Sequence, residues 1–198
     1  MYLAGKVIGK EGTQLFSASL PEGAELAASG WTLTPDPGDA RKIAILSGDE
    51  FSGTWDRKGG RHCPSYVRGW DPYRQAWVER IYYAGSAESL RGPYTIGYIE
   101  WDGGKWVDQA APVFLATEDW EHGSVYEPNL IYAEGMWKLW YVAGSNQEGY
   151  LIQGFAESLD GRTDWTSRKV FSVLRKRFSI SARSTGNTSM KRFFCGSG

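Results

Sequence analysis

The feature that most constrains the fold is an internal repeat with a period of about 60 residues. One copy, "CPSYVRGWDPYRQAWVERIYYAGS", begins at Cys63, and the other, "YEPNLIYAEGMWKLWYVAGS", begins at Tyr126. Each copy runs from a proline through an apolar segment, a turn and an aromatic-rich segment to Ala-Gly-Ser. Because similar units repeated at this spacing build a core by stacking on one another, the repeat is the first guide to the fold.

The similarity extends beyond Ala-Gly-Ser. The segment "IGYIEWDGGKW", which begins at Ile96, corresponds to "IQGFAESLDGRTDW", which begins at Ile152. The second copy divides into four segments of strand length with turn residues between them, at 127–132, 136–143, 151–157 and 165–173. A repeated antiparallel meander of four strands is typical of a β-propeller blade. A β-sandwich with two similar hairpin pairs is the alternative that the pattern leaves open.

We therefore predict an all-β chain built from propeller blades. The blades are expected at 62–125 and 126–173, with a third and less regular unit at 1–61 and a basic tail at 174–198. Closed propellers typically have four to eight blades, so this ring is incomplete. We expect a homo-oligomer that completes the partial ring. Two alternatives are that the tail covers an open edge, or that the chain is a truncated product.

Composition and charge narrow the classes of function. The chain has 10 Trp, 11 Tyr and 25 Gly, which favour strands and turns. Residues 174–198 hold six cations and no acidic residue, so a net charge of -1 overall leaves -7 for residues 1–173. An acidic body argues against nucleic acid as a partner. The tail is a solvated segment or a site for an acidic partner.

Other sequence signals argue against metals, cofactors and membranes. Two cysteines, Cys63 and Cys195, and two histidines, His62 and His122, do not have the spacing of a metal site. We predict no cofactor. The first residues lack a long apolar core, so neither a signal peptide nor a membrane span is expected, and the cytoplasm is the default location.

The second copy resembles the blade repeat of the five-bladed propeller glycosidases. These are the family-43 group of β-xylosidases and arabinanases and the family-32 group of invertase-like enzymes. The residues that carry the resemblance are "YEPNLIYAEGMWKLWYVAGS" and "GFAESLDGRTDW", and the similarity covers about 55–171. The resemblance implies an incomplete ring of the five-bladed type and a carbohydrate as substrate or ligand.

The resemblance also implies carboxylates at the start of the innermost strand of each blade. Glu127, directly before Pro128, occupies the slot of the general acid. The matching slot one blade earlier holds Cys63 where the family has an aspartate, and Cys63 is predicted to be a small packing residue. Candidates for the catalytic base are Asp56, Asp36 and Asp49. Hydrolysis of a glycosidic bond needs two carboxylates that flank it.

Several side chains are candidates for binding the sugar, since an aromatic ring can stack on its apolar face. They are His62, Trp55, Trp70, Trp120 and Tyr126. The alternative for most aromatic residues is packing between blades, and for Glu127 the equal alternative is hydrogen bonding to backbone donors at a strand entrance. The sequence thus predicts a glycosidase-like propeller with Glu127 as general acid. A non-catalytic carbohydrate-binding or interaction propeller is the alternative.

Overall fold

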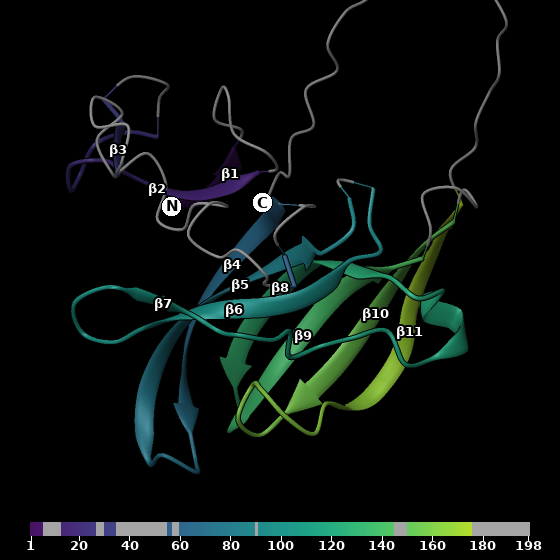
Figure 1. Cartoon of the computed structure of the whole chain (residues 1–198). Helices are drawn as coiled ribbons and strands as arrows, with labels where there is room; N and C mark the ends of the chain where they lie inside the picture. Colours follow the sequence, from purple (N-terminus) through teal and green to yellow (C-terminus); the bar gives the residue numbers. More distant parts are fainter. Residues whose placement is uncertain are drawn as a thin grey trace, which may run out of the picture.

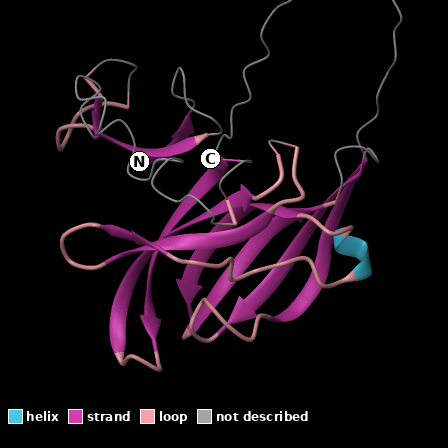
Figure 2. Cartoon of the chain, in the orientation of Figure 1, coloured by secondary structure: helices cyan, strands magenta, loops and turns pink. Residues whose placement is uncertain are grey.

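The computed structural model of the chain describes residues 1–5, 13–26, 30–34, 55–56, 60–89, 91–144 and 150–175. These residues form an all-β structure of three antiparallel sheets, with one short 3-10 helix (Figure 1 and Figure 2). None of the sheets closes on itself within the described ranges. The all-β class predicted from the sequence is therefore confirmed.

Each sheet is formed from strands that follow one another along the chain. Sheet A contains β1 (Tyr2–Gly5), β2 (Gln14–Ser19) and β3 (Thr32–Thr34); sheet B contains β4 (Gly60–Asp71), β5 (Ala76–Ser86), β6 (Thr95–Trp101) and β7 (Trp106–Asp108); sheet C contains β8 (Val125–Ala133), β9 (Met136–Ala143), β10 (Tyr150–Ser158) and β11 (Thr166–Arg175). The short helix is η3 (Asp119–Glu121) and precedes sheet C. Sheets B and C are thus the two four-stranded meanders that the repeat predicts.

Local sequence explains how these strands form. In β9, Trp137, Leu139, Tyr141 and Ala143 are buried and the residues between them are partly exposed, which is the period of two of a strand. The turn from β8 to β9 is Glu134-Gly135, and both residues have positive φ, at 56° and 77°. This is the conformation of a two-residue hairpin turn, and it fixes the register of the pair.

The three sheets are stacked in chain order. Tyr82 and Tyr98 of sheet B pack with Leu130 and Trp137 of sheet C in the main core cluster. The other face of sheet B, through Ile81 and its neighbours, packs against β1 and β2 in a second cluster. The first strands of sheets B and C, β4 and β8, lie beside each other. The backbone N–H of Leu130 in β8 donates to Ser65 Oγ in β4 at 2.9 Å. The two proline-led segments therefore share one environment, as the repeat requires.

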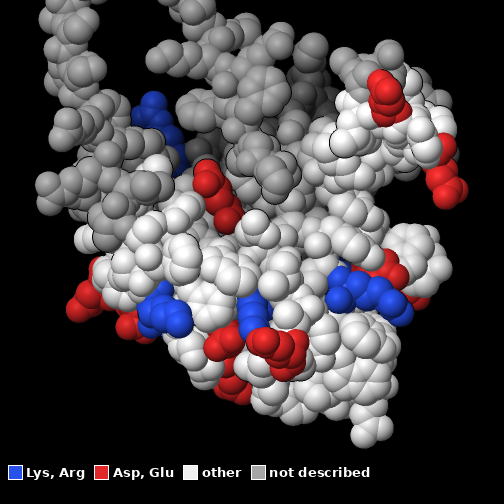
Figure 3. All heavy atoms as spheres, turned by 180° about the vertical axis from the view of Figure 1, so that it is seen from behind, with Lys and Arg blue, Asp and Glu red and all other residues white. Residues whose placement is uncertain are grey.

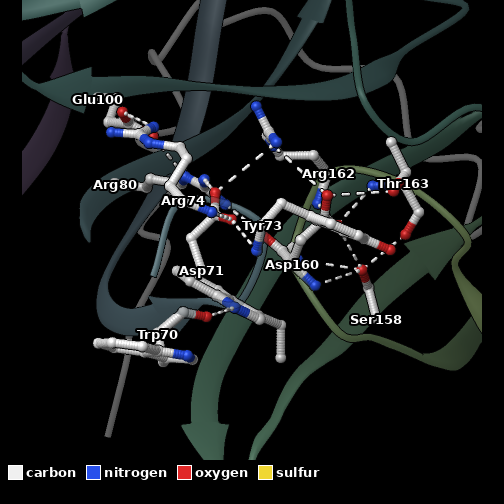
Figure 4. Close-up of polar contacts among 12 residues, drawn as sticks. Trp70, Asp71, Tyr73, Arg74, Arg80, Glu100, Ser158, Asp160, Arg162 and Thr163 are labelled. Atoms are coloured by element: carbon white, nitrogen blue, oxygen red, sulfur yellow. Dashed lines mark hydrogen bonds and ion pairs between the residues drawn. The ribbon is translucent and has the colours of Figure 1, made fainter. Parts of the chain in front are cut away.

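A buried polar cluster joins sheets B and C (Figure 4). The Arg80 side chain is fully buried and forms ion pairs with Asp71 at 3.1 Å and Glu100 at 2.8 Å. It also donates to the carbonyl oxygen of Asp160, in the turn between β10 and β11, at 2.5 Å. Its guanidinium lies 4.9 Å from the centre of the Trp137 ring, a cation–π contact. The turn after β10 is thereby held against sheet B.

The turns after β6 and after β10 have the same construction. Asp102 Oδ1 accepts from the backbone N–H groups of Lys105 and Gly104, which lower the pKa of its carboxyl. Asp160 Oδ1 accepts in the same way from two backbone N–H groups, at 2.8 Å each. Burial opposes this effect at Asp160, yet the hydrogen bonds prevail and its pKa lies below the usual value. Both turns contain an Asp-Gly pair, Asp102-Gly103 and Asp160-Gly161, and both are Asx turns.

The structure refines the alignment of the two copies. An alignment of the two copies on Ala-Gly-Ser makes Tyr82 equivalent to Tyr141. The strand registers instead make Tyr83 equivalent to Tyr141, because each of these tyrosines lies opposite the bulge of its own sheet. Among the aromatic residues of the two copies, Tyr82, Tyr83, Trp137 and Tyr141 are buried, but Trp77 and Trp101 are exposed. A slip of one residue reverses the face of every side chain in a strand, so the register decides which aromatics reach the core.

Candidate functional site

The proposed site centres on a bulge near the start of each proline-led strand. In β4, Cys63 and Pro64 lie opposite the single residue Tyr83. In β8, Glu127 and Pro128 lie opposite Tyr141 in the same way. Two residues facing one is the definition of a β-bulge, and bulges are frequent beside active sites, where they redirect a side chain. The structure thus gives Cys63 and Glu127 equivalent positions.

Both bulge residues adopt the left-handed backbone conformation. The φ angle is 50° at Cys63 and 53° at Glu127. For a residue with a Cβ atom this conformation costs about 1–2 kcal/mol, because Cβ approaches the carbonyl oxygen. Strain of this kind is found where the surroundings impose it, often at functional sites. The Glu127 residue is exposed to solvent, which a group acting on a ligand requires.

The residue opposite the first bulge is fixed by a buried carboxylate. The Tyr83 hydroxyl donates to Asp56 Oδ2 at 2.9 Å, and Arg61 Nε donates to the same oxygen at 2.7 Å. The Trp55 ring stacks on the Tyr83 ring with 5.3 Å between centroids. Burial, followed by the charge of Asp56, raises the pKa of Tyr83, so the phenol stays protonated as a donor.

The second bulge has the same support with different residues. The Tyr141 hydroxyl donates to Glu121 Oε1 at 2.5 Å, and Arg168 forms an ion pair with the Glu121 carboxylate at 3.0 Å. The Trp120 ring stacks on the Tyr141 ring at 6.1 Å. Burial and then the hydrogen bond to Glu121 raise the pKa of Tyr141. We call this arrangement of tryptophan, carboxylate and tyrosine the bulge support.

Each bulge support has a glycine of the neighbouring strand against its tryptophan, and Gly85 lies against Trp55 as well. A Cβ atom at Gly97 would lie 2.2 Å from the Trp55 ring, and one at Gly154 would lie 2.8 Å from the Trp120 ring. Such distances are far below van der Waals contact, so a side chain at either position would displace the tryptophan. The Gly-Tyr and Gly-Phe dipeptides of the two copies are thereby explained by close packing.

Titratable and aromatic side chains gather at the shared end of β4 and β8. The His62 ring meets the Tyr94 ring edge-on at 5.5 Å, and Tyr94 lies 5.8 Å from Tyr126. Thr13 Oγ1 is 3.3 Å from a ring nitrogen of His62. Burial raises the pKa of Tyr126 to about 12, with a further contribution from the charge of Glu127. His62 and Tyr126, which the sequence singled out, therefore both contact Tyr94, and Glu127 follows Tyr126 in β8.

The remaining sequence candidates have other surroundings. Asp56 is fully buried and, as described above, pairs with Arg61 and Tyr83. Trp55 and Trp120 take part in the bulge supports. Trp70 lies at the far end of β4, where its carbonyl oxygen accepts from Trp137 Nε1 at 2.9 Å and its ring meets Trp77. Asp36 and Asp49 lie outside the described residues.

Sequence reasoning missed Glu121 and its partner Arg168. A signal was present, since Trp55-Asp56 and Trp120-Glu121 are both a tryptophan followed by an acid, shortly before the proline of each copy. The repeated pair indicates that Asp56 and Glu121 hold equivalent places, whereas the sequence reading gave Asp56 a catalytic role and Glu121 none. The exposure of Glu127 and the burial of Glu121 show that only the first carboxylate can meet a ligand from solvent.

Within the described ranges, no group of three or more His, Cys, Asp or Glu side chains could hold a metal ion. The part of the chain that is described has no helix long and apolar enough to cross a bilayer. Seen from behind, the surface carries acidic and basic groups side by side (Figure 3).

Comparisons with known proteins leave the family open. No protein-family model matches the chain, no curated protein matches it, and no solved structure matches it. The assignment of function therefore depends on the geometry of the chain itself.

Proposed function

We propose that this chain is a glycoside-hydrolase-like propeller protein that acts on or binds a carbohydrate, with Glu127 as the general acid. The observation that carries the proposal is the equivalence of Cys63 and Glu127. Both are left-handed bulge residues directly before a proline, on strands that lie side by side. A propeller enzyme places its site at the starts of such strands, so the position of Glu127 suits a group that meets a ligand.

The propeller itself is part of the proposal. Two meanders of four strands, stacked in chain order with their first strands adjacent, are what two neighbouring blades would present. Sheet A would then be the described part of a third blade. We propose an incomplete ring of the five-bladed type, in which β4 and β8 are the innermost strands.

The chemistry would be general acid catalysis at a glycosidic oxygen. Glu127 would donate the proton, and a second carboxylate about 5–10 Å away would act as base or nucleophile. Asp56 is a poor second carboxylate, because its oxygen already accepts from Arg61 and Tyr83 in the interior. Asp36 remains a candidate for this role. Half-buried His62 would form the wall against which a sugar packs, with Tyr94 and Tyr126 buried behind it at 8% and 9% exposed.

One observation favours a second candidate function, a propeller that binds carbohydrate without hydrolysing it. In sheet B the slot equivalent to Glu127 holds Cys63, where the resembling enzymes carry an aspartate. A site that lacks this carboxylate would keep the aromatic wall and lose part of the acid–base machinery. The two candidates share the same ligand class and differ in turnover.

The experiment compares the chain with Glu127→Gln on a panel of aryl glycosides. Loss of a general acid lowers the rate by about 10²- to 10⁴-fold. Glu134→Gln is the matched control, because Glu134 is an exposed glutamate in the turn at the opposite end of β8. Turnover that Glu127→Gln abolishes and Glu134→Gln preserves supports the enzyme.

Calorimetric titration with oligosaccharides distinguishes the alternative. Binding without turnover, weakened by Tyr126→Ala, supports the non-catalytic propeller. If the folded chain neither hydrolyses aryl glycosides nor binds any oligosaccharide of the panel, both candidate functions are wrong.

A further inference from the structure

The registers of sheets B and C allow their faces to be compared position by position. Tyr82 pairs with Ser65, and its counterpart Trp140 pairs with Asn129. Tyr82 also pairs with Tyr98 on β6, as Trp140 pairs with Phe155 on β10. By the same registers, Val67 corresponds to Ile131 and Arg80 to Lys138.

On sheet B these positions form the interface with sheet C. Val67, Tyr82 and Tyr98 are buried in the core that the two sheets share. Ser65 accepts from the backbone of Leu130, and Arg80 donates to the carbonyl oxygen of Asp160. Every one of these positions therefore contacts the neighbouring sheet.

On sheet C the counterparts point away from sheet B. We call them the outer face of sheet C, and they are Asn129, Ile131, Lys138, Trp140 and Phe155, to which Met136 is added because it lies on the same side of β9 as Lys138. Ile131 is 45% exposed, and Asn129 is exposed as well. The main contacts of sheet C with other described strands are to sheet B, on its opposite face. The outer face thus has the character of a packing surface at the end of the stack.

The chemistry of this face suits a copy of itself. Half-buried Trp140 packs on buried Phe155, with 5.0 Å between their rings, and together they form an apolar centre. Charges of both signs surround this centre: Lys138 and Glu157 lie opposite each other on β9 and β10, and Lys169 Nζ is 4.9 Å from the Phe155 ring. A two-fold axis between two such faces would place the Trp140 and Phe155 side chains of one copy against those of the other. It would also bring Lys138 near the partner's Glu157.

We propose that the outer face of sheet C is the contact surface for a second copy of this chain, packed sheet on sheet about a two-fold axis. At about 3.3 Å per residue and about 4.8 Å between strands, a sheet of four strands with nine residues each has a face of roughly 600 Å². This is less than the ~800 Å² per partner of a stable complex, so the dimer is reversible. The inference goes beyond the proposed function and holds whether or not the chain turns over a sugar.

The experiment measures the molar mass of the full chain by sedimentation across a wide range of micromolar concentrations. The wild-type chain is expected to move from monomer to dimer as the concentration rises. Ile131→Glu places a charge on the exposed part of the face formed by β8, so its dissociation constant is expected to rise at least tenfold. Leu115→Glu is the matched control, because Leu115 is 48% exposed and belongs to the segment between β7 and η3.

Circular dichroism and thermal melting establish that both variants are folded. A dimer that Ile131→Glu weakens and Leu115→Glu leaves unchanged supports the proposal. A wild-type chain that stays monomeric throughout, or a dimer indifferent to Ile131→Glu, overturns it. Polymers of indefinite size would overturn the two-fold arrangement, because only a closed contact stops at two copies.

Discussion

Sheets B and C have one backbone plan and different chemistry. Both have a left-handed bulge before a proline, a tyrosine opposite it and a buried acid that accepts from that tyrosine. The bulge residue itself is Cys63 in one sheet and Glu127 in the other. The comparison shows that the bulge support, and not the bulge residue, maintains the backbone conformation. The bulge residue can therefore differ between the two sheets without loss of the fold.

The second difference concerns the opposite face of each sheet. Arg80 of sheet B is buried among Asp71, Glu100 and the turn of sheet C, whereas its counterpart Lys138 pairs with Glu134 near solvent. The same position therefore holds a buried residue that links two sheets in sheet B, Arg80, and a residue near the surface in sheet C, Lys138. This contrast predicts very different effects of the same substitution.

The largest effect is expected for Arg80→Met. The substitution leaves the Asp71 carboxylate buried without its main cation, which costs about 3–5 kcal/mol. Lys138→Met removes only a surface ion pair with Glu134, so the free energy of unfolding should change very little. Urea unfolding of the two variants measures the difference. Equal losses would contradict the account of the joint between the sheets.

An intermediate effect is expected when the bulge supports lose their hydroxyl groups. Tyr83→Phe and Tyr141→Phe each leave a buried carboxylate with one donor fewer, at about 1–3 kcal/mol. Tyr66→Phe is the control, because its hydroxyl donates to Glu79 near the surface and should cost about 0.5 kcal/mol or less. Thermal melting compares the three. If only one of the buried tyrosines mattered, the two supports would not be equivalent.

The smallest effect is expected at the bulge residues. Cys63→Gly and Glu127→Gly relieve the left-handed strain and should each stabilise the fold by about 0.5–1 kcal/mol. Cys63→Val should destabilise it, because a β-branched side chain tolerates positive φ poorly. Chemical unfolding of the three variants tests the sign. Destabilisation by both glycine variants would indicate that the Cys63 and Glu127 side chains stabilise the fold by more than the left-handed backbone strain destabilises it.

Much of the fold was readable from the sequence because it repeats. The four strands of each meander, the Glu134-Gly135 turn and the proximity of the two prolines all followed from the alignment. The side-chain periodicity and turn residues behind these predictions are local properties of the chain. The propeller ring remains a proposal, since the described residues include two full meanders and three strands of a third sheet.

The bulge supports were less accessible to sequence reasoning. Glu121 and Arg168 lie 47 residues apart in sequence, and no local sequence pattern predicts the hydrogen bonds between them. The alignment by Ala-Gly-Ser was displaced by one residue because a bulge changes the register without changing composition. Whether Asp56 was catalytic or structural also depended on burial, which only the fold supplies.

The central claim is that Cys63 and Glu127 hold equivalent left-handed positions on two strands that lie side by side. Nuclear magnetic resonance tests it most directly, through contacts between the Leu130 amide proton and the Ser65 side chain. We predict this contact, together with the strong amide-to-α-proton contact of a left-handed residue at both 63 and 127. If Leu130 shows no proximity to Ser65, or if either bulge residue is extended, the equivalence of the two sheets is wrong.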